Sequence, residues 1–217
     1  MGRTRRAGLA GIEFALVAPV LLTMFLGTVD ISGALLTARR MEIAAGSVAE
    51  IGTTAASQTQ TLNQLTDVQA WQATTAPFAL FPAWTAKINQ GSFAITLSAI
   101  AFSATPAGCT QACGYTANVR WSVGNELGVA RLRACGPLAA APNGDAASYL
   151  TLPVGNFGAT SLLVADISYT FVPMFFGFLV GAIPMMQSAY VSPRINTDLS
   201  LLSNRGKGVA VFCPVAS

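Results

Sequence analysis

An apolar stretch interrupted by a single carboxylate constrains this chain more than any other feature. Within Arg5–Gly27, which reads RRAGLAGIEFALVAPVLLTMFLG, arginines and a glycine lead into an apolar run. From Leu9 to Thr28 the only charged residue is Glu13. About 20 residues at ~1.5 Å per residue make a helix of ~30 Å, long enough to cross a bilayer core. A charge at the centre of such a helix costs on the order of 2.5–3.5 kcal/mol, so Glu13 calls for a compensating interaction.

The residues before this stretch predict its orientation. Residues 1–8 form a short basic leader that contains three arginines. The positive-inside rule keeps such a leader in the cytoplasm and exports the chain that follows the span. Two other interpretations remain open, namely an ordinary secretory signal peptide and a Glu13 that merely snorkels at the membrane face.

Composition limits the class of protein. The chain has 217 residues, of which 53% are hydrophobic and 10% charged, which is more apolar than a typical soluble domain. This length suits one membrane anchor and one domain of ordinary size. The net charge is only +3 and no basic stripe alternates with aromatic residues, so we expect no nucleic-acid partner.

Histidine and cysteine usage limits the chemistry. The chain has no histidine, which excludes Ser-His-Asp and Cys-His nucleophiles and histidine-containing metal sites. An even number of cysteines in an exported domain favours two disulfides, and four cysteines allow three connectivities. The spacing of the first two cysteines matches zinc sites poorly, so we expect no metal and no cofactor. The four cysteines are Cys109, Cys113, Cys135 and Cys213.

Helical patterns continue beyond the apolar stretch. Apolar residues recur at steps of three or four through the segment 31–48, and no strong breaker occurs before the Thr/Ser/Gln tract at 53–61. We therefore predict one long helix from about Leu9 to about Ala56. A weaker helix is predicted over 62–73, and the proline-punctuated segment 77–84 is predicted to be a packed loop or a short helix.

Strand patterns dominate the second half of the chain. Partial alternation predicts a strand near 92–102, and clean alternation predicts one at 115–124. A strong strand pattern covers 161–173, and a final strand is predicted over 187–195. Residues 136–159 are rich in Gly, Pro, Ala and Asn, which indicates loops around one short strand.

A charge-free run at 171–186 permits two interpretations. A second membrane span is one of them, but the run is shorter than the ~20 residues usually needed, and prolines and glycines interrupt it. A return to the cytoplasm would also put Cys213 in a reducing compartment. We favour a hairpin-like apolar loop that lies on the domain or on the membrane surface.

Two blocks of the sequence resemble a known family. Gly8-Leu9-Ala10-Gly11-Ile12-Glu13-Phe14 resembles the processing motif of type IV prepilins, in which a peptidase cuts after the glycine and glutamate is the fifth residue of the mature chain. The continuation EFALVAPVLLTMFLGTVDISGALLTARRMEIAAG resembles the N-terminal block of TadE-like pseudopilins (the TadE/TadF/TadG group) of the tight-adherence (Flp-type) pilus system. The segment VADISYTFVPMFFGFLVGAIPMMQSAYVSPR resembles their C-terminal tyrosine–proline segment.

The resemblance implies a processing site and a set of partners. Gly8 and Leu9 would flank the cut, and Glu13 with Phe14 would serve recognition and assembly. The new amine on Leu9 would lie one helical turn from Glu13, so the carboxylate could pair with it or with the amine of a neighbouring subunit. The implied partners are a prepilin peptidase, other pilins or pseudopilins, the Tad inner-membrane platform proteins and the lipid bilayer.

These observations combine into one expected architecture. We predict an α+β protein with a leader (1–8), a transmembrane helix that continues into an amphipathic helix (9–57) and a small β-rich exported domain with short helices (58–217). The expected location is the inner membrane, single-pass, with the N-terminus cytoplasmic and the C-terminal domain periplasmic. For the disulfides we favour Cys109–Cys113 within its loop and Cys135–Cys213 to hold the tail.

Two other classes of function compete with a pilin-like subunit. The first is a secreted or membrane-anchored envelope domain with a conventional signal sequence and a binding role. The second is an enzyme, which we do not expect, because the carboxylates Asp145, Asp166 and Asp198 lack paired-acid spacing. We assign these three aspartates to turns or to the surface.

Overall fold

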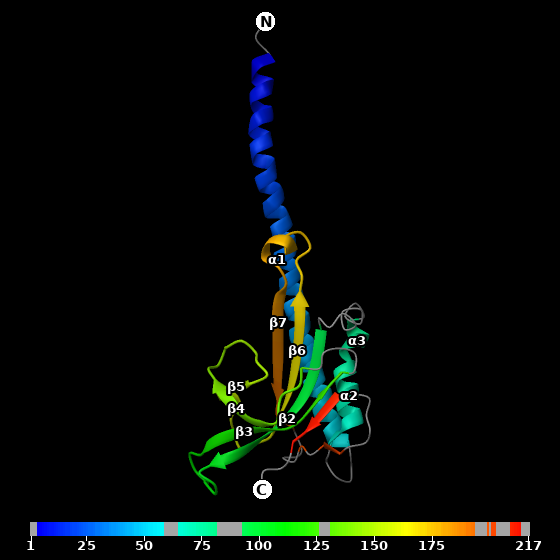
Figure 1. Cartoon of the computed structure of the whole chain (residues 1–217), viewed down its shortest axis with the longest axis vertical. Helices are drawn as coiled ribbons and strands as arrows, with labels where there is room; N and C mark the ends of the chain where they lie inside the picture. Colours follow the sequence, from blue (N-terminus) through cyan, green and yellow to red (C-terminus); the bar gives the residue numbers. More distant parts are fainter. Residues whose placement is uncertain are drawn as a thin grey trace. The chain divides into compact units, whose positions relative to one another are not determined.

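The computed structural model describes residues 4–58, 65–81, 93–125, 131–193, 199, 201–202 and 209–213. It confirms a long apolar N-terminal helix followed by a β-rich domain with short helices (Figure 1). The described chain separates into two compact units. The first, here called the anchor unit, contains the helix as far as Arg39 together with Phe171–Ile183, and the second, the sheet unit, contains Arg40–Thr170 and the residues from Pro184 onward.

Helix α1 (Thr4–Gln58) runs through 55 residues without a break, although Pro19 lies inside it. Proline removes one backbone donor, and a helix tolerates this in an apolar medium when neighbouring groups adjust. The predicted helix over about Leu9–Ala56 falls within these bounds. Its last turns belong to the sheet unit, where one face of the helix is buried. The buried residues of this face recur at helical spacing and are Met41, Ala44, Ala45, Val48 and Ala49.

Two short helices follow α1 in the sheet unit. Helix α2 (Asp67–Thr75) begins with a capping box, in which the Thr66 hydroxyl accepts from the Gln69 backbone and the Gln69 side chain accepts from the Thr66 backbone. The predicted start at 62 lies outside the described residues, and this box explains why the helix begins where it does. Helix α3 (Pro77–Leu80) is the short helix allowed by the prediction for 77–84, of which 82–84 lie outside the described residues.

A curled mixed sheet forms the rest of the sheet unit. Its strands follow the order β5-β4-β3-β2-β6-β7, and β9 pairs with β3 beyond the end of β4. The pairs β2–β3 and β2–β6 are antiparallel, whereas β4–β5 is parallel. A separate parallel pair joins β1 and β8. The strand bounds are β1 Leu65–Thr66, β2 Phe93–Thr105, β3 Gly114–Gly124, β4 Gly136–Ala141, β5 Thr151–Pro153, β6 Leu162–Phe171, β7 Ile183–Val191, β8 Leu201–Leu202 and β9 Val209–Phe212.

Strand β6 is buried on both faces over its first seven residues, and its side chains alternate between two cores. Leu163, Ala165 and Ile167 face the core that contains α1 and α2. Leu162 and Val164 face a second core that contains Leu138 of β4 and Leu152 of β5. A strand buried on both faces carries apolar residues at successive positions, as β6 does over Leu162–Ala165.

Strand β3 contains a bulge that its sequence pattern hides. Ala99 pairs with Trp121 whereas Ile100 pairs with Val119, which leaves Arg120 as the extra residue. The extra residue reverses the side-chain alternation, so that Val119 faces the second core and Trp121 faces the first.

Two predictions for the second half of the chain need correction. Residues 136–159 hold two strands and a 3-10 turn (η1, Val154–Asn156), because β4, although half exposed, pairs with β3 and β5. Strand β7 begins at Ile183 and not at 187, so part of the charge-free run is strand. Helix α5 (Gly177–Val180), with four residues, is the only helix described between β6 and β7. At about 6 Å it is far too short to span a membrane, which favours the loop over the second span.

Candidate functional site

The predicted processing site lies in the first turns of α1. Gly8 and Leu9 are helical, and Glu13 follows Leu9 in the chain by about one helical turn. The side chains of Glu13 and Phe14 are exposed, Phe14 by 72%. Among the described residues, α1 is the one helix long and apolar enough to cross a membrane, and none of its most apolar window is buried. The helix therefore presents an apolar surface and one carboxylate that its own chain does not cover.

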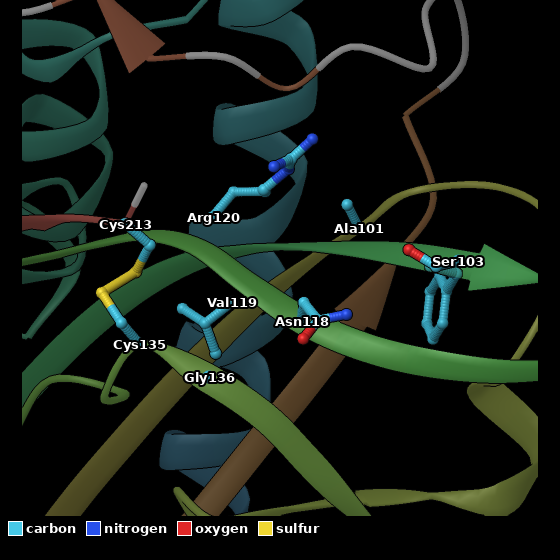
Figure 2. Close-up of a pocket in the computed structure, with 9 residues that line it drawn as sticks. Ala101, Ser103, Asn118, Val119, Arg120, Cys135, Gly136 and Cys213 are labelled. Atoms are coloured by element: carbon cyan, nitrogen blue, oxygen red, sulfur yellow. A yellow bond between two sulfur atoms is a disulfide. The ribbon is translucent and has the colours of Figure 1, made fainter. Parts of the chain in front are cut away.

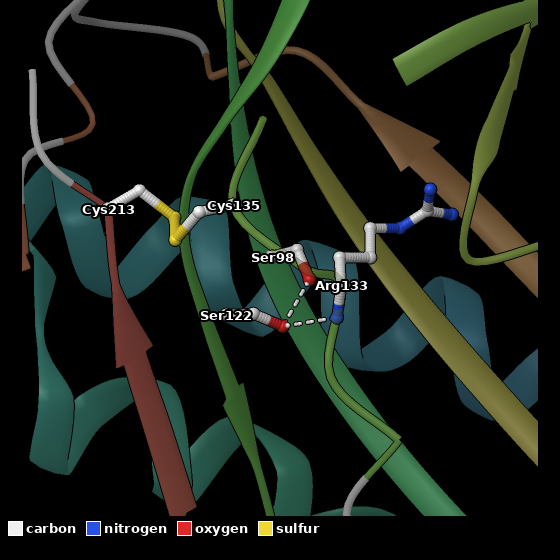
Figure 3. The surroundings of a disulfide bond; sticks show 5 residues. All are labelled: Ser98, Ser122, Arg133, Cys135 and Cys213. Atoms are coloured by element: carbon white, nitrogen blue, oxygen red, sulfur yellow. Dashed lines mark hydrogen bonds between the residues drawn. A yellow bond between two sulfur atoms is a disulfide. The ribbon is translucent and has the colours of Figure 1, made fainter. Parts of the chain in front are cut away.

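The structure contains both disulfides in the pairing favoured from the sequence. Cys109–Cys113 closes the loop between β2 and β3, with Cα atoms 5.7 Å apart. Cys135–Cys213 joins the segment before β4 to the end of β9, with Cα atoms 5.4 Å apart and a sequence separation of 78 (Figure 3). One N-terminal apolar helix and two disulfides suggest a membrane-anchored domain outside the cytoplasm.

A shallow cavity of about 340 Å³ lies beside the second disulfide (Figure 2). Its wall includes the disulfide itself and the bulged Arg120, whose carbonyl accepts the backbone N–H of Cys213 at 2.9 Å. The guanidinium of Arg120 is the only ionisable side chain in the described lining, so this lining contains no acid–base pair. The other lining residues are Ala101, Phe102, Ser103, Asn118, Val119 and Gly136.

A buried ion pair organises the second core of the sheet unit. Arg133 and Asp166 are both 0% exposed, and they form a bidentate pair with Nε–Oδ2 at 2.7 Å and Nη2–Oδ1 at 2.9 Å. Arg133 also donates from Nη1 to the carbonyls of Tyr149 and Thr151. The assignment of Asp166 to a turn or the surface is therefore wrong. Asp145 is exposed as expected, and Asp198 lies outside the described residues.

Hydroxyl groups extend this network across the sheet. The Ser188 hydroxyl of β7 donates to Asp166. The backbone N–H of Arg133 donates to the Ser122 hydroxyl, which shares a 2.8 Å hydrogen bond with the Ser98 hydroxyl (Figure 3). The segment around Arg133 thus joins strands β2, β3, β5, β6 and β7. Because neither charge reaches solvent, the network has a structural role.

Two tyrosines border the network. Burial raises the pKa of Tyr149, and the nearby Ser168 hydroxyl opposes this rise. No direct hydrogen bond to that hydroxyl forms, so the Tyr149 hydroxyl is buried without a partner among the described residues. Burial also raises the pKa of Tyr190, and the neighbouring Ser188 hydroxyl opposes the rise. Both tyrosines therefore remain neutral to a higher pH than a free tyrosine.

The anchor unit has its own carboxylate site. Asp30 of α1 is 8% exposed and accepts hydrogen bonds from three successive backbone N–H groups. Met174 donates to Oδ1 at 2.8 Å, Phe175 donates to Oδ2 at 3.1 Å, and Phe176 donates to Oδ2 at 2.8 Å. A carboxylate with several such donors is well satisfied as an anion. Asp30 thus fixes the start of the loop between β6 and β7.

Sequence reasoning missed Asp30, Arg133 and the burial of Asp166. For Asp30 a signal existed, because it is the only charged residue between Glu13 and Arg39. For Arg133 and Asp166 no signal existed, since their partners are set by strand register. Among the described residues, no three His, Cys, Asp or Glu side chains lie close enough together to hold a metal ion.

Comparison with protein families gives a match, which lies in the N-terminal helix. Residues 8–50 match the model of the family described as TadE-like protein. This region is TadE-like. The match begins at Gly8 and covers both Glu13 and Asp30. Neither the curated proteins nor the solved structures gave a match to the chain. The match covers about a fifth of the chain, and all of it lies within α1.

Proposed function

We propose that this protein is a minor pilin or pseudopilin-like component of a Tad (Flp, type IV-like) pilus system. In this proposal a prepilin peptidase cuts after Gly8, and the mature chain, which begins at Leu9, acts without catalysis in assembly or initiation of the pilus at the inner membrane. The observation that carries the proposal is the TadE-like match, which starts at the glycine of the processing motif.

The exposed surface of α1 supports an assembly role. A membrane helix that only anchors a domain needs no carboxylate near its start, and Glu13 is exposed on the described chain. An amine created on Leu9 would lie one turn away or on an adjacent subunit, and pairing would offset the cost of placing the charge in lipid. Glu13 would then set the register of packed helices, with other pilins and the platform proteins as partners.

The proposed cut is tested by the mass of the N-terminal peptide. The chain, co-expressed with a prepilin peptidase, is expected to yield a mature protein that begins at Leu9. Gly8→Leu should block the cut and leave membrane insertion intact. Gly11→Leu is the matched control, because a side chain at Gly11 meets no other group within 4 Å. An intact Met1 in the unmodified chain, or a cut beyond Thr28 with release of a soluble domain, would contradict the proposal.

Assembly is tested separately from processing. Glu13→Gln removes the charge and keeps the size of the side chain, so we expect normal trimming and insertion but loss of co-purification with other pilins or platform proteins. Glu42→Gln is the control, since this glutamate of the same helix lies beyond the predicted span. Equal co-purification of the two variants would argue against Glu13 as an assembly residue.

A further inference from the structure

The segment 172–182, here called the apolar loop, exposes large hydrophobic side chains to an unusual degree. Phe178 is 87% exposed, and four more side chains of the loop are at least 60% exposed. The run 171–186 contains no charged residue. Soluble surfaces rarely gather so much exposed apolar area in one place, so this surface calls for a partner. The four others are Val172, Met174, Leu179 and Val180.

The apolar loop is fixed against α1 within the anchor unit. The three N–H groups bound to Asp30 hold its first turn. A Cβ placed on Gly33 would lie 3.6 Å from the Phe171 ring, and one placed on Gly27 would lie 3.7 Å from the Phe176 ring. From Phe171 to Phe176 the chain therefore runs back toward the start of α1. It reaches the level of Gly27, which is inside the apolar stretch that ends at Thr28.

The helix beside the loop is equally apolar and exposed. Met24, Phe25, Ile31 and Leu35 are each more than 60% exposed. Helix and loop together line an apolar pocket of about 280 Å³, so their exposed surfaces are continuous. The one charge in this region, that of Asp30, is bound to backbone N–H groups and needs no water.

We propose that the apolar loop inserts into the lipid bilayer at its extracytoplasmic face and forms a second membrane contact beside α1. Lipid is the occupant because the loop surface continues the surface of the helix that must itself contact lipid, and because the loop reaches the depth of the last span residues. Large hydrophobic side chains without charge suit the boundary between headgroups and acyl chains. This inference rests on the proposed insertion of α1 in the membrane.

Lipids with brominated acyl chains test the insertion, because they quench tryptophan fluorescence at short range. The full chain is reconstituted in phosphatidylcholine–phosphatidylglycerol vesicles, and the quenching of the unmodified chain, which has three tryptophans, is subtracted. Phe178→Trp reports the loop. Leu21→Trp, at a position in the middle of the apolar stretch, reports insertion of α1. Leu150→Trp is the matched negative control, since Leu150 is a 70% exposed apolar residue of the sheet unit.

We expect Leu21→Trp and Phe178→Trp to lose most of their added fluorescence and Leu150→Trp to keep its own. Quenching of Leu21→Trp without quenching of Phe178→Trp would overturn this inference and leave the proposed function standing. Absence of quenching at Leu21 would overturn both. If the Phe178→Trp emission instead varies with the protein-to-lipid ratio and not with bromination, a second copy covers the loop and the inference is wrong.

Discussion

Asp30 and Asp166 are two carboxylates held away from solvent by different means. Asp166 lies in the sheet unit, is 0% exposed and faces an equally buried guanidinium. Asp30 lies in the anchor unit, is 8% exposed and faces only backbone N–H groups of one loop. Removal of Asp166 leaves a buried charge without a partner, whereas removal of Asp30 leaves three neutral N–H groups near the surface. The first residue should therefore govern the stability of a whole unit, and the second the position of one loop.

The largest effect should follow from Asp166→Ala. The Arg133 guanidinium would remain in the core without its counter-charge, which typically destabilises a protein by about 3–5 kcal/mol. Urea unfolding of the full chain in detergent, followed by near-ultraviolet circular dichroism, measures this loss. The double variant Arg133→Met/Asp166→Leu should recover much of the stability, because it removes both charges and keeps apolar volume. If the double variant is no more stable than the single variant, the stranded charge does not explain the effect.

The two disulfides both lie in the sheet unit, and they should stabilise it by different amounts. Loop-closure entropy predicts about 4.5 kcal/mol from the 78-residue separation of Cys135–Cys213 and about 2 kcal/mol from the short loop of Cys109–Cys113. We expect Cys135→Ser/Cys213→Ser to lower the urea midpoint more than Cys109→Ser/Cys113→Ser, which serves as the matched control. Equal midpoints would mean that β9 is held by its pairing with β3 alone.

Asp30→Asn should act locally. Asparagine keeps one carbonyl oxygen, but its amide nitrogen cannot accept, so the bonds that Phe175 and Phe176 donate to Oδ2 would be lost. Hydrogen exchange at the Met174–Phe176 amides should accelerate while the urea midpoint of the sheet unit stays unchanged. Asp145→Asn, at an exposed site of the sheet unit, should change neither quantity. A lowered midpoint in Asp30→Asn would break the distinction between the two carboxylates.

The sequence predicted the elements whose patterns are local, and it missed what depends on register. The apolar run of α1 and the apolar, β-branched and aromatic residues of β6 can be recognised from the sequence, because each pattern involves only neighbouring residues. Strand β4 was not predicted, because its sequence GPLAAA is half exposed and has low β propensity. Arg133 and Asp166 are 33 residues apart, and Asp30 is 144 residues from Met174. Only the packing of the elements brings these partners together, so no local pattern could report them.

The smallest expected effect is the pH dependence of stability that Tyr149 of the sheet unit causes. Because burial raises the pKa of Tyr149 above its usual value near 10, the unfolded chain releases this proton first as the pH rises. The contribution of Tyr149 to stability should therefore be constant below about pH 10 and be lost as the pH rises through the higher pKa of the folded state. In Tyr149→Phe the decline should be weaker, and at pH 7 its stability should change little, because the hydroxyl has no partner to lose. Urea midpoints between pH 8 and 11 measure this, with Tyr149→Phe/Tyr190→Phe expected to flatten the curve further. An identical alkaline decline in all three chains would place its origin outside these two tyrosines.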